Sequence, residues 1–259
     1  MEYIFQKIND VKIISKPFPH IIIEDFFDEE FINELINSIK IDNINEIKSK
    51  YHEVIYPGAI DKKLSLTTRP TGSGLVYALN KSILDKHEIF VNLLESDGFK
   101  QVLFDKFNIP KEIDGWNVYQ INKDLNGYEI SPHPDVTGKI ITWQCNITND
   151  NTLDNYNLST RLHTIKPEYK DELNKITSDK NPRPWGKWEW FDEGISVPYK
   201  ENAFFAFAPS NISHHSVILD NYPQDRSQRT MMRGFIVDNR LLEKKPKEFW
   251  QPGNIVNII

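Results

Sequence analysis

The chain has 259 residues, of which 39% are hydrophobic and 12% aromatic, and its formal net charge is −6. This composition supplies a sizeable core and lacks the basic stripe of a nucleic-acid binder, so no nucleic-acid partner is expected. A single cysteine, Cys145, excludes an intrachain disulfide and a cysteine-based zinc site. The sequence starts without a secretory signal and has no bilayer-length apolar run. We therefore expect a soluble, cytoplasmic protein without a membrane partner; its oligomeric state is left open.

The first third of the chain predicts mainly helices. Runs of β-branched residues at 11–15 and 21–24 indicate two short strands around a proline-rich turn. Residues 28–39 open with acidic side chains and continue with apolar residues at helical spacing, which predicts a helix. Residues 44–78 are polar and irregular, whereas the apolar spacing over 81–107 predicts two or three helices.

Beyond residue 110 the pattern changes to strands. The predicted strands span residues 116–121, 128–135, 139–148, 202–208, 215–219 and 230–237. Several short strands after a helical lead-in favour an α+β fold with a mainly β core. We expect a double-stranded β-helix, or jelly roll, with the N-terminal helices packed on one face.

We expect one domain over residues 1–259. Within it, residues 1–110 form a helical support region, and 111–240 form the jelly-roll core. Residues 149–200 are expected to be an insert in that core, with a helix over 167–176.

The most informative residues for chemistry are His133 and Asp135, in the sequence Ser-Pro-His-Pro-Asp. Residues i and i+2 of a strand project to the same face, so both side chains can enter one cavity. They would supply two thirds of the two-histidine, one-carboxylate set that holds iron(II) on a single face. The alternative is a surface turn with two polar residues. A distal histidine follows the apolar run 203–208, and because His214 and His215 are neighbours on a strand, only one of them can face that cavity.

Arginines follow the distal histidines, at Arg226, Arg229 and Arg233. A guanidinium group beside an iron site suits the far carboxylate of a dicarboxylic co-substrate, because its planar fork makes two hydrogen bonds to a carboxylate. The alternative is a solvated edge strand.

Together these motifs resemble the iron(II)/2-oxoglutarate dioxygenase superfamily, and within it the prolyl-4-hydroxylase-like branch. The resemblance rests on the order His133-x-Asp135, a distal histidine before Ser216-Val217, and an arginine at the start of a terminal strand. Three further segments resemble the family, at residues 16–27, 118–130 and 158–162. Ser159 stands where the family has glycine, and the arginine follows the distal histidine at a longer spacing than usual.

The resemblance implies specific roles for individual residues. His133 and Asp135 match the first two iron ligands, and His215 matches the third better than His214, because it directly precedes Ser216. Arg229 matches the arginine that binds 2-oxoglutarate.

Two parts of the co-substrate site stay open at this stage. Arg226 and Arg233 are alternatives to Arg229. Tyr119 stands where the family often supplies a second contact to the same carboxylate, and the alternative is a core tyrosine.

The implied activity uses Fe(II), 2-oxoglutarate and O2, and ascorbate is a further candidate cofactor. Oxidative decarboxylation of 2-oxoglutarate would give succinate and CO2 and drive hydroxylation of an unactivated carbon. The prime substrate is expected to be a peptide, an amino acid, a sugar or a small metabolite.

Two other functions compete with this reading. One is a cupin-like metalloenzyme that does not use 2-oxoglutarate, and the other is a non-catalytic binding module on the same fold. In the latter, the Trp185–Trp190 stretch would be a platform for carbohydrate or peptide. For an active enzyme, these rings are expected either to line the mouth of the iron site or to fill a satellite core.

Polar residues that alternate along one predicted strand are further candidates for the cavity. Thr142, Gln144 and Asn146 share a face, and Cys145 would lie on the other side as a small buried residue. The remaining histidines lack partner spacing and are expected to be structural: His20, His52, His87 and His163.

Overall fold

The computed structural model describes residues 2–39, 88–124, 129–135, 138–147, 157–178, 186–219 and 229–238, with short strands at 54–55, 63–64 and 74–77. Several residues singled out from the sequence lie outside these ranges: His52, His87, Trp185 and Arg226. Within the described ranges, no helix has the length and apolar character needed to cross a membrane.

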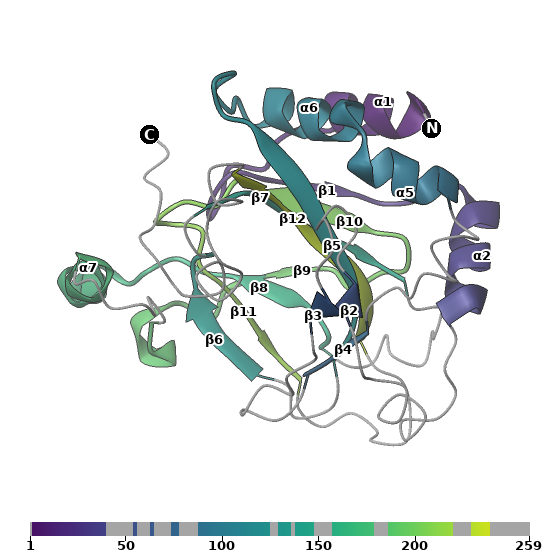
Figure 1. The fold of residues 1–259 in the computed structure, drawn as a ribbon. Coiled ribbons are helices and arrows are strands. Elements are labelled where there is room, and N and C mark those ends of the chain that lie inside the picture. The colour runs from purple at the N-terminus through teal and green to yellow at the C-terminus, as the bar shows by residue number, and fades with distance from the viewer. Residues whose placement is uncertain are drawn as a thin grey trace.

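Two antiparallel sheets form the centre of the fold (Figure 1). The larger sheet has the order β1-β10-β7-β12-β5-β4, with strands β1 (His20–Ile23), β10 (Phe204–Phe207), β7 (Lys139–Asn146), β12 (Arg229–Asp238), β5 (Gly115–Asp124) and β4 (Gly74–Tyr77). The smaller sheet has the order β6-β11-β8-β9, with strands β6 (Glu129–His133), β11 (His215–Ile218), β8 (Thr160–Leu162) and β9 (Ile195–Val197). A separate pair joins β2 (Val54–Ile55) to β3 (Lys63–Leu64). This is the jelly-roll core expected from the sequence.

The N-terminal helices lie on one side of the larger sheet, at the top and right of Figure 1. They are α1 (Glu2–Asp10), α2 (Glu29–Ile39), α5 (Glu88–Glu95) and α6 (Asp97–Lys106). Their apolar residues form one buried cluster with the side chains that the larger sheet points toward them. Helix α7 (Lys170–Ser178) lies apart from them, and two short 3-10 turns complete the described elements, η2 (Pro167–Tyr169) and η3 (Trp188–Trp190).

Strand β10 shows which side chains face which layer. All four of its residues are buried, as expected for a strand covered on both faces. Phe204 and Ala206 belong to the cluster with the helices. Phe205 and Phe207 pack against Leu162 and other apolar residues of the smaller sheet. The space between the sheets is therefore on the Phe205 side.

Strand pairing transfers this assignment to β7. Phe205 lies opposite Gln144, and Phe207 lies opposite Thr142. Alternation places Asn146 on the same face, so all three polar residues point between the sheets, as the sequence predicted. Cys145 faces the helices and is fully buried.

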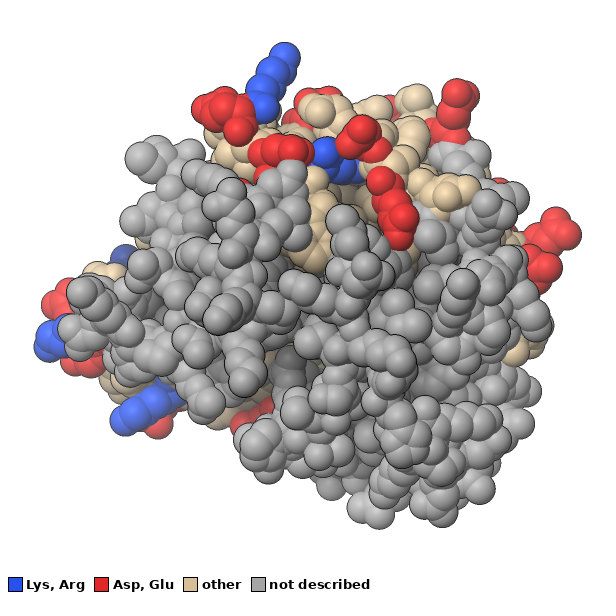
Figure 2. All heavy atoms as spheres, viewed as in Figure 1, with Lys and Arg blue, Asp and Glu red and all other residues tan. Residues whose placement is uncertain are grey.

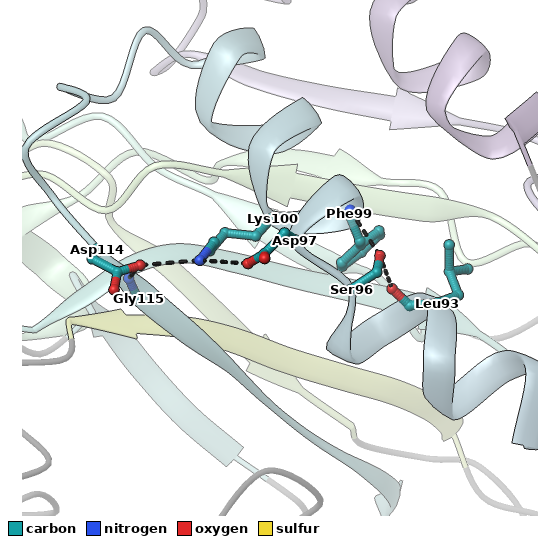
Figure 3. A network of polar contacts seen from close by, with 7 residues as sticks. All are labelled: Leu93, Ser96, Asp97, Phe99, Lys100, Asp114 and Gly115. Carbon is teal, nitrogen blue, oxygen red and sulfur yellow. Dashed lines mark hydrogen bonds and ion pairs between the residues drawn. The ribbon is translucent and has the colours of Figure 1, made fainter.

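The start of α6 is fixed by a network of polar contacts (Figure 3). The Ser96 hydroxyl caps the helix by accepting from the Phe99 amide at 3.1 Å, and it donates to the Leu93 carbonyl at 2.7 Å. Lys100 lies 3.0 Å from both Asp97 and Asp114, which ties the helix to the residue that precedes β5. The break between the two predicted helices is therefore a capped boundary at Ser96.

Acidic side chains gather at the top of the face drawn in Figure 2, where α1, α5 and α6 lie in Figure 1. This agrees with the net charge of −6. A helical edge with solvated charges needs no ligand to explain it.

Three local predictions were wrong. The strand expected at 11–15 is reduced to one bridge between Ile14 and His20, and a helix, α1, precedes it. The region 44–78, expected to be irregular, contributes the short strands β2, β3 and β4. The segment 149–200 is not external to the core, since it supplies β8 and β9 of the smaller sheet. Strands of three residues are too short for alternation to be visible in the sequence.

Candidate metal centre

The smaller sheet brings together three residues with metal-binding groups. His133 at the end of β6 lies opposite His215 at the start of β11, and their ring centroids are 4.4 Å apart. Asp135 follows two residues after His133, and one ligand atom from each of the three lies within 4.8 Å of the other two. Prolines on both sides of His133 are compatible with an edge strand, where backbone donors are not needed.

Both imidazole rings are oriented by their own backbone. Nδ1 of His133 lies 2.8 Å from the Ser131 carbonyl oxygen, and Nδ1 of His215 lies 3.1 Å from the Ser213 carbonyl oxygen. Because Nδ1 must carry the proton to donate to a carbonyl, Nε2 keeps its lone pair. Burial is the largest effect on both rings and lowers the pKa of each. Both rings are thus neutral near pH 7, the form that binds a metal.

The third group, Asp135, is held as a carboxylate. Lys139 Nζ lies 2.5 Å from Asp135 Oδ1, and the Thr142 hydroxyl donates to Oδ2. Burial alone would raise the pKa of Asp135, but the neighbouring charges, of which Lys139 is the strongest, lower it below its usual range. The Lys139 ammonium group also lies 3.5 Å from the centre of the Phe235 ring. Two neutral imidazoles and one carboxylate are the donor set that non-haem iron(II) oxygenases use, so these residues fit ferrous iron.

His214 faces away from this cluster. Its ring stacks at a tilt on Phe191 with centroids 4.8 Å apart, and burial lowers its pKa to about 4. Its Nε2 is buried without a hydrogen-bond partner among the described residues. The structure therefore brings His215, and not His214, to the cluster with His133.

Arg229 lies between the sheets at a second polar site. Its side chain is 2% exposed, its Nε donates to the Leu158 carbonyl at 2.7 Å, and its Nη2 donates to the Thr160 hydroxyl at 2.6 Å. The guanidinium carbon lies 5.8 Å from the centre of the Tyr199 ring. These contacts fix a buried cation on the inner face of β12.

A row of polar side chains on β7 connects the two sites. Thr142 donates to Asp135, and two positions further on, about 7 Å along the strand, Gln144 donates to Thr160 at 3.2 Å. Thr160 in turn accepts from Arg229. The metal ligands and the guanidinium group thus lie at opposite ends of one polar stripe inside the barrel.

The other co-substrate candidates lie in different places. Arg233 is opposite Gln144, so it shares the inner face of β12 with Arg229, and it is half-buried. Tyr119 does not reach the site. It lies opposite Gly234, on the face of β5 that packs against the helices, and its hydroxyl donates to Glu95 at 3.1 Å. The alternative reading of Tyr119 as a core residue is the one its position supports.

The aromatic residues of the 149–200 segment lie on the outer face of the smaller sheet. Trp190 and Phe191 form a satellite cluster with Leu173. Trp188 donates from Nε1 to Glu129 at 2.7 Å, and its ring meets His163 edge-on. These rings do not line the metal site, so the expectation of an aromatic mouth is wrong for the described residues of this segment.

The remaining histidines are held by local hydrogen bonds, as expected of structural residues. Nδ1 of His20 lies 2.8 Å from the Phe18 carbonyl oxygen, and Nε2 of His163 lies 2.7 Å from the Ser216 hydroxyl. The sequence analysis missed two contributors to the site, Lys139 and Thr160. A lysine four positions after a carboxylate, or a lone threonine, carries no distinguishing signal.

Similarity to known proteins was sought at three levels. No protein-family model matches the sequence, and no curated protein matches it. Among solved structures, the chain is similar to a prolyl hydroxylase from Trichoplax adhaerens, in complex with a hypoxia inducible factor oxygen degradation domain peptide fragment, at 11% identity and a TM-score of 0.52. That alignment covers 94% of this chain and 92% of the other. The fold is that of the prolyl hydroxylases.

Two further prolyl 4-hydroxylases are also similar. The Pseudomonas putida enzyme is 8% identical, with a TM-score of 0.49 over 91% of this chain and 98% of the other. The Phytophthora capsici enzyme is 11% identical, with a TM-score of 0.47 over 95% of this chain and 68% of the other. At such identities the shared feature is the prolyl-hydroxylase fold, and the first match confirms at that level the resemblance seen in the sequence.

Proposed function

We propose that the protein is an Fe(II)- and 2-oxoglutarate-dependent dioxygenase that hydroxylates an unactivated carbon. The observation that carries this proposal is the cluster of His133, Asp135 and His215 inside a jelly roll. Two imidazoles and one carboxylate on one side of a metal leave three positions for co-substrate and oxygen. When bound, iron would activate O2 for oxidation, with 2-oxoglutarate as the source of two electrons.

The second polar site supports 2-oxoglutarate as the co-substrate. Its keto-acid end would bind the metal, and its far carboxylate would reach Arg229 and the Thr160 hydroxyl. The separation of the two ends is set by the two-residue step from Thr142 to Gln144 on β7, a length that a five-carbon dicarboxylate can span. A buried guanidinium already held by two hydrogen bonds is pre-organised for a bidentate contact.

The protein's own groups would orient and protect the reacting molecules. Ser131 and Ser213 carbonyls hold the imidazole rings, while Lys139 and Thr142 hold the Asp135 carboxylate. Apolar side chains between the sheets, such as Phe207, whose ring centroid lies 5.1 Å from that of His215, exclude water from one side of the metal.

A metalloenzyme that does not use 2-oxoglutarate is the second candidate. It would leave the buried arginine at the end of the polar stripe without a ligand to bind, which makes it the weaker explanation. A peptide, an amino acid, a sugar or a small metabolite would serve as prime substrate, and ascorbate stays a candidate cofactor.

The proposal is tested by binding measurements under argon. In isothermal titration, 2-oxoglutarate should bind the Fe(II)-loaded protein and not the metal-free protein, and iron-dependent succinate formation should follow on adding O2. Asp135→Ala and His215→Ala should lose Fe(II) binding, whereas His214→Ala, which removes a ring on the outer face, should keep it. Iron affinity that survived His215→Ala and disappeared in His214→Ala would refute the assignment, and co-substrate binding without metal would refute the mechanism.

A further inference from the structure

The metal end of the chamber carries positive charge that the proposed reaction does not use. Lys139, Arg229 and Arg233 bring cationic groups between the sheets, where Asp135 supplies a carboxylate. Lys139 contacts the metal ligand itself, and Arg229 is bound at the far end of the stripe. The third cation, Arg233, lies between these two ends.

Register fixes the position of Arg233. Along the inner face of β12, it stands four residues from Arg229 and two from Phe235, whose ring contacts Lys139. Two residues along a strand are about 7 Å, which an arginine side chain can bridge. Its charge is close enough to lower the pKa of His215. The guanidinium group therefore lies on the metal side of the co-substrate site.

Exposure separates the two arginines further. Arg229 is 2% exposed and donates to Leu158 and Thr160, whereas Arg233 is half-buried. A buried, pre-organised arginine suits a co-substrate that binds first and deep. A partly accessible one beside the metal suits a molecule that enters afterwards.

We propose that Arg233 binds an anionic group, a carboxylate or a phosphate, of the prime substrate and so holds the carbon to be oxidised next to the metal. This rests on the proposed function and names its substrate class. The planar guanidinium fork pairs with either anion through two hydrogen bonds. Lys139 adds positive potential on the same side, and a cationic chamber in a protein of net charge −6 concentrates anions locally.

The test compares matched acids and amides. Succinate formation by the Fe(II)-loaded protein is measured with free L-amino acids, with the same amino acids as carboxamides, and with phosphorylated and unphosphorylated serine. The stimulating compounds should be anionic, and conversion to the neutral form should remove the stimulation. Carboxylates and phosphates then identify the source of the charge.

Variants link the effect to the residue. Arg233→Met should raise the KM of a stimulating compound at least tenfold, with 2-oxoglutarate affinity and uncoupled 2-oxoglutarate turnover near wild type. Arg161→Met is the matched control, because Arg161 neighbours the inward-facing Leu162 on β8 and therefore projects from the outer face. It should leave every parameter unchanged.

A second readout does not require the substrate to be found. Under argon, the Fe(II)- and 2-oxoglutarate-loaded protein is titrated with acetate and with inorganic phosphate. At least one of these probes should bind to the wild type and the Arg161 variant and not to Arg233→Met. Equal binding in all three proteins, or stimulation by neutral amides equal to that by acids, would overturn the proposal. Loss of metal-dependent 2-oxoglutarate binding in the wild type would instead overturn the proposed function.

Discussion

Replacing Arg229 by methionine tests the co-substrate site most specifically. Methionine keeps most of the apolar stem and removes the guanidinium group, with its hydrogen bonds to Leu158 and Thr160. In the proposed complex, the far carboxylate of 2-oxoglutarate would then be buried without a cation.

The magnitude follows from burial. At 2% exposure, the guanidinium group is shielded from the solvent that makes surface ion pairs weak. Truncating one partner of a buried, hydrogen-bonded charge pair costs about 2–5 kcal/mol. Since about 1.4 kcal/mol is tenfold in affinity, 2-oxoglutarate should bind at least about 30-fold more weakly. Arg229→Lys should recover only part of this, because an ammonium group lacks the planar fork.

The assay is isothermal titration of 2-oxoglutarate into the Fe(II)-loaded variant under argon, with Fe(II) binding measured separately. Iron affinity should change little, because Arg229 lies at the opposite end of the polar stripe from Asp135. Arg161→Met on the outer face serves as the control for loss of a charge. An unchanged 2-oxoglutarate affinity in Arg229→Met, with a loss in Arg233→Met, would refute the reasoning and move the co-substrate contact to Arg233.

Three further outcomes are expected. The metal-free protein should lose stability as the pH falls below about 6.5, because burial lowers the pKa of His133, His214 and His215, so that the unfolded chain takes up protons that the folded chain does not. Urea unfolding should show a slope of up to about 1.4 kcal/mol per pH unit for each such histidine, and a flat profile would contradict it. Trp190→Ala should destabilise the protein by about 3–5 kcal/mol while uncoupled 2-oxoglutarate turnover persists at low temperature, because the ring fills a satellite core; an unchanged melting temperature would argue against that role. Ser96→Ala should cost about 1 kcal/mol in the same unfolding assay through loss of the α6 cap, and no change would mean that the cap contributes nothing.

The sequence predicted the metal ligands because the relevant rule is local. A strand places residues i and i+2 on one face, so His133 and Asp135 could be paired without knowing the fold. Choosing His215 over its neighbour needed the family resemblance, since alternation says only that the two differ. The inward stripe from Thr142 to Asn146 was predicted by the same alternation.

Errors arose where the answer depends on strand pairing. Alternation cannot say which face of β5 meets the helices, and only the pairing of Tyr119 with Gly234 reveals that the tyrosine points away from the metal. Similarly, β8 and β9 contribute three residues each, which leaves no periodic signal. The role of Thr160 could not be predicted, because it depends on a contact with Arg229, 69 positions away.

The most direct test of the central claim is release of labelled CO2 from 2-oxoglutarate labelled at its C1 carboxylate, measured with the wild type and Asp135→Ala. The wild type, supplied with Fe(II) and O2, should release CO2 and form succinate in equal amounts, and a chelator should abolish both. Asp135→Ala, still folded, should release neither. Release of CO2 by the variant at the wild-type rate, or its absence from the iron-loaded wild type under every substrate tested, would contradict the assignment of this chain as a 2-oxoglutarate-dependent oxygenase.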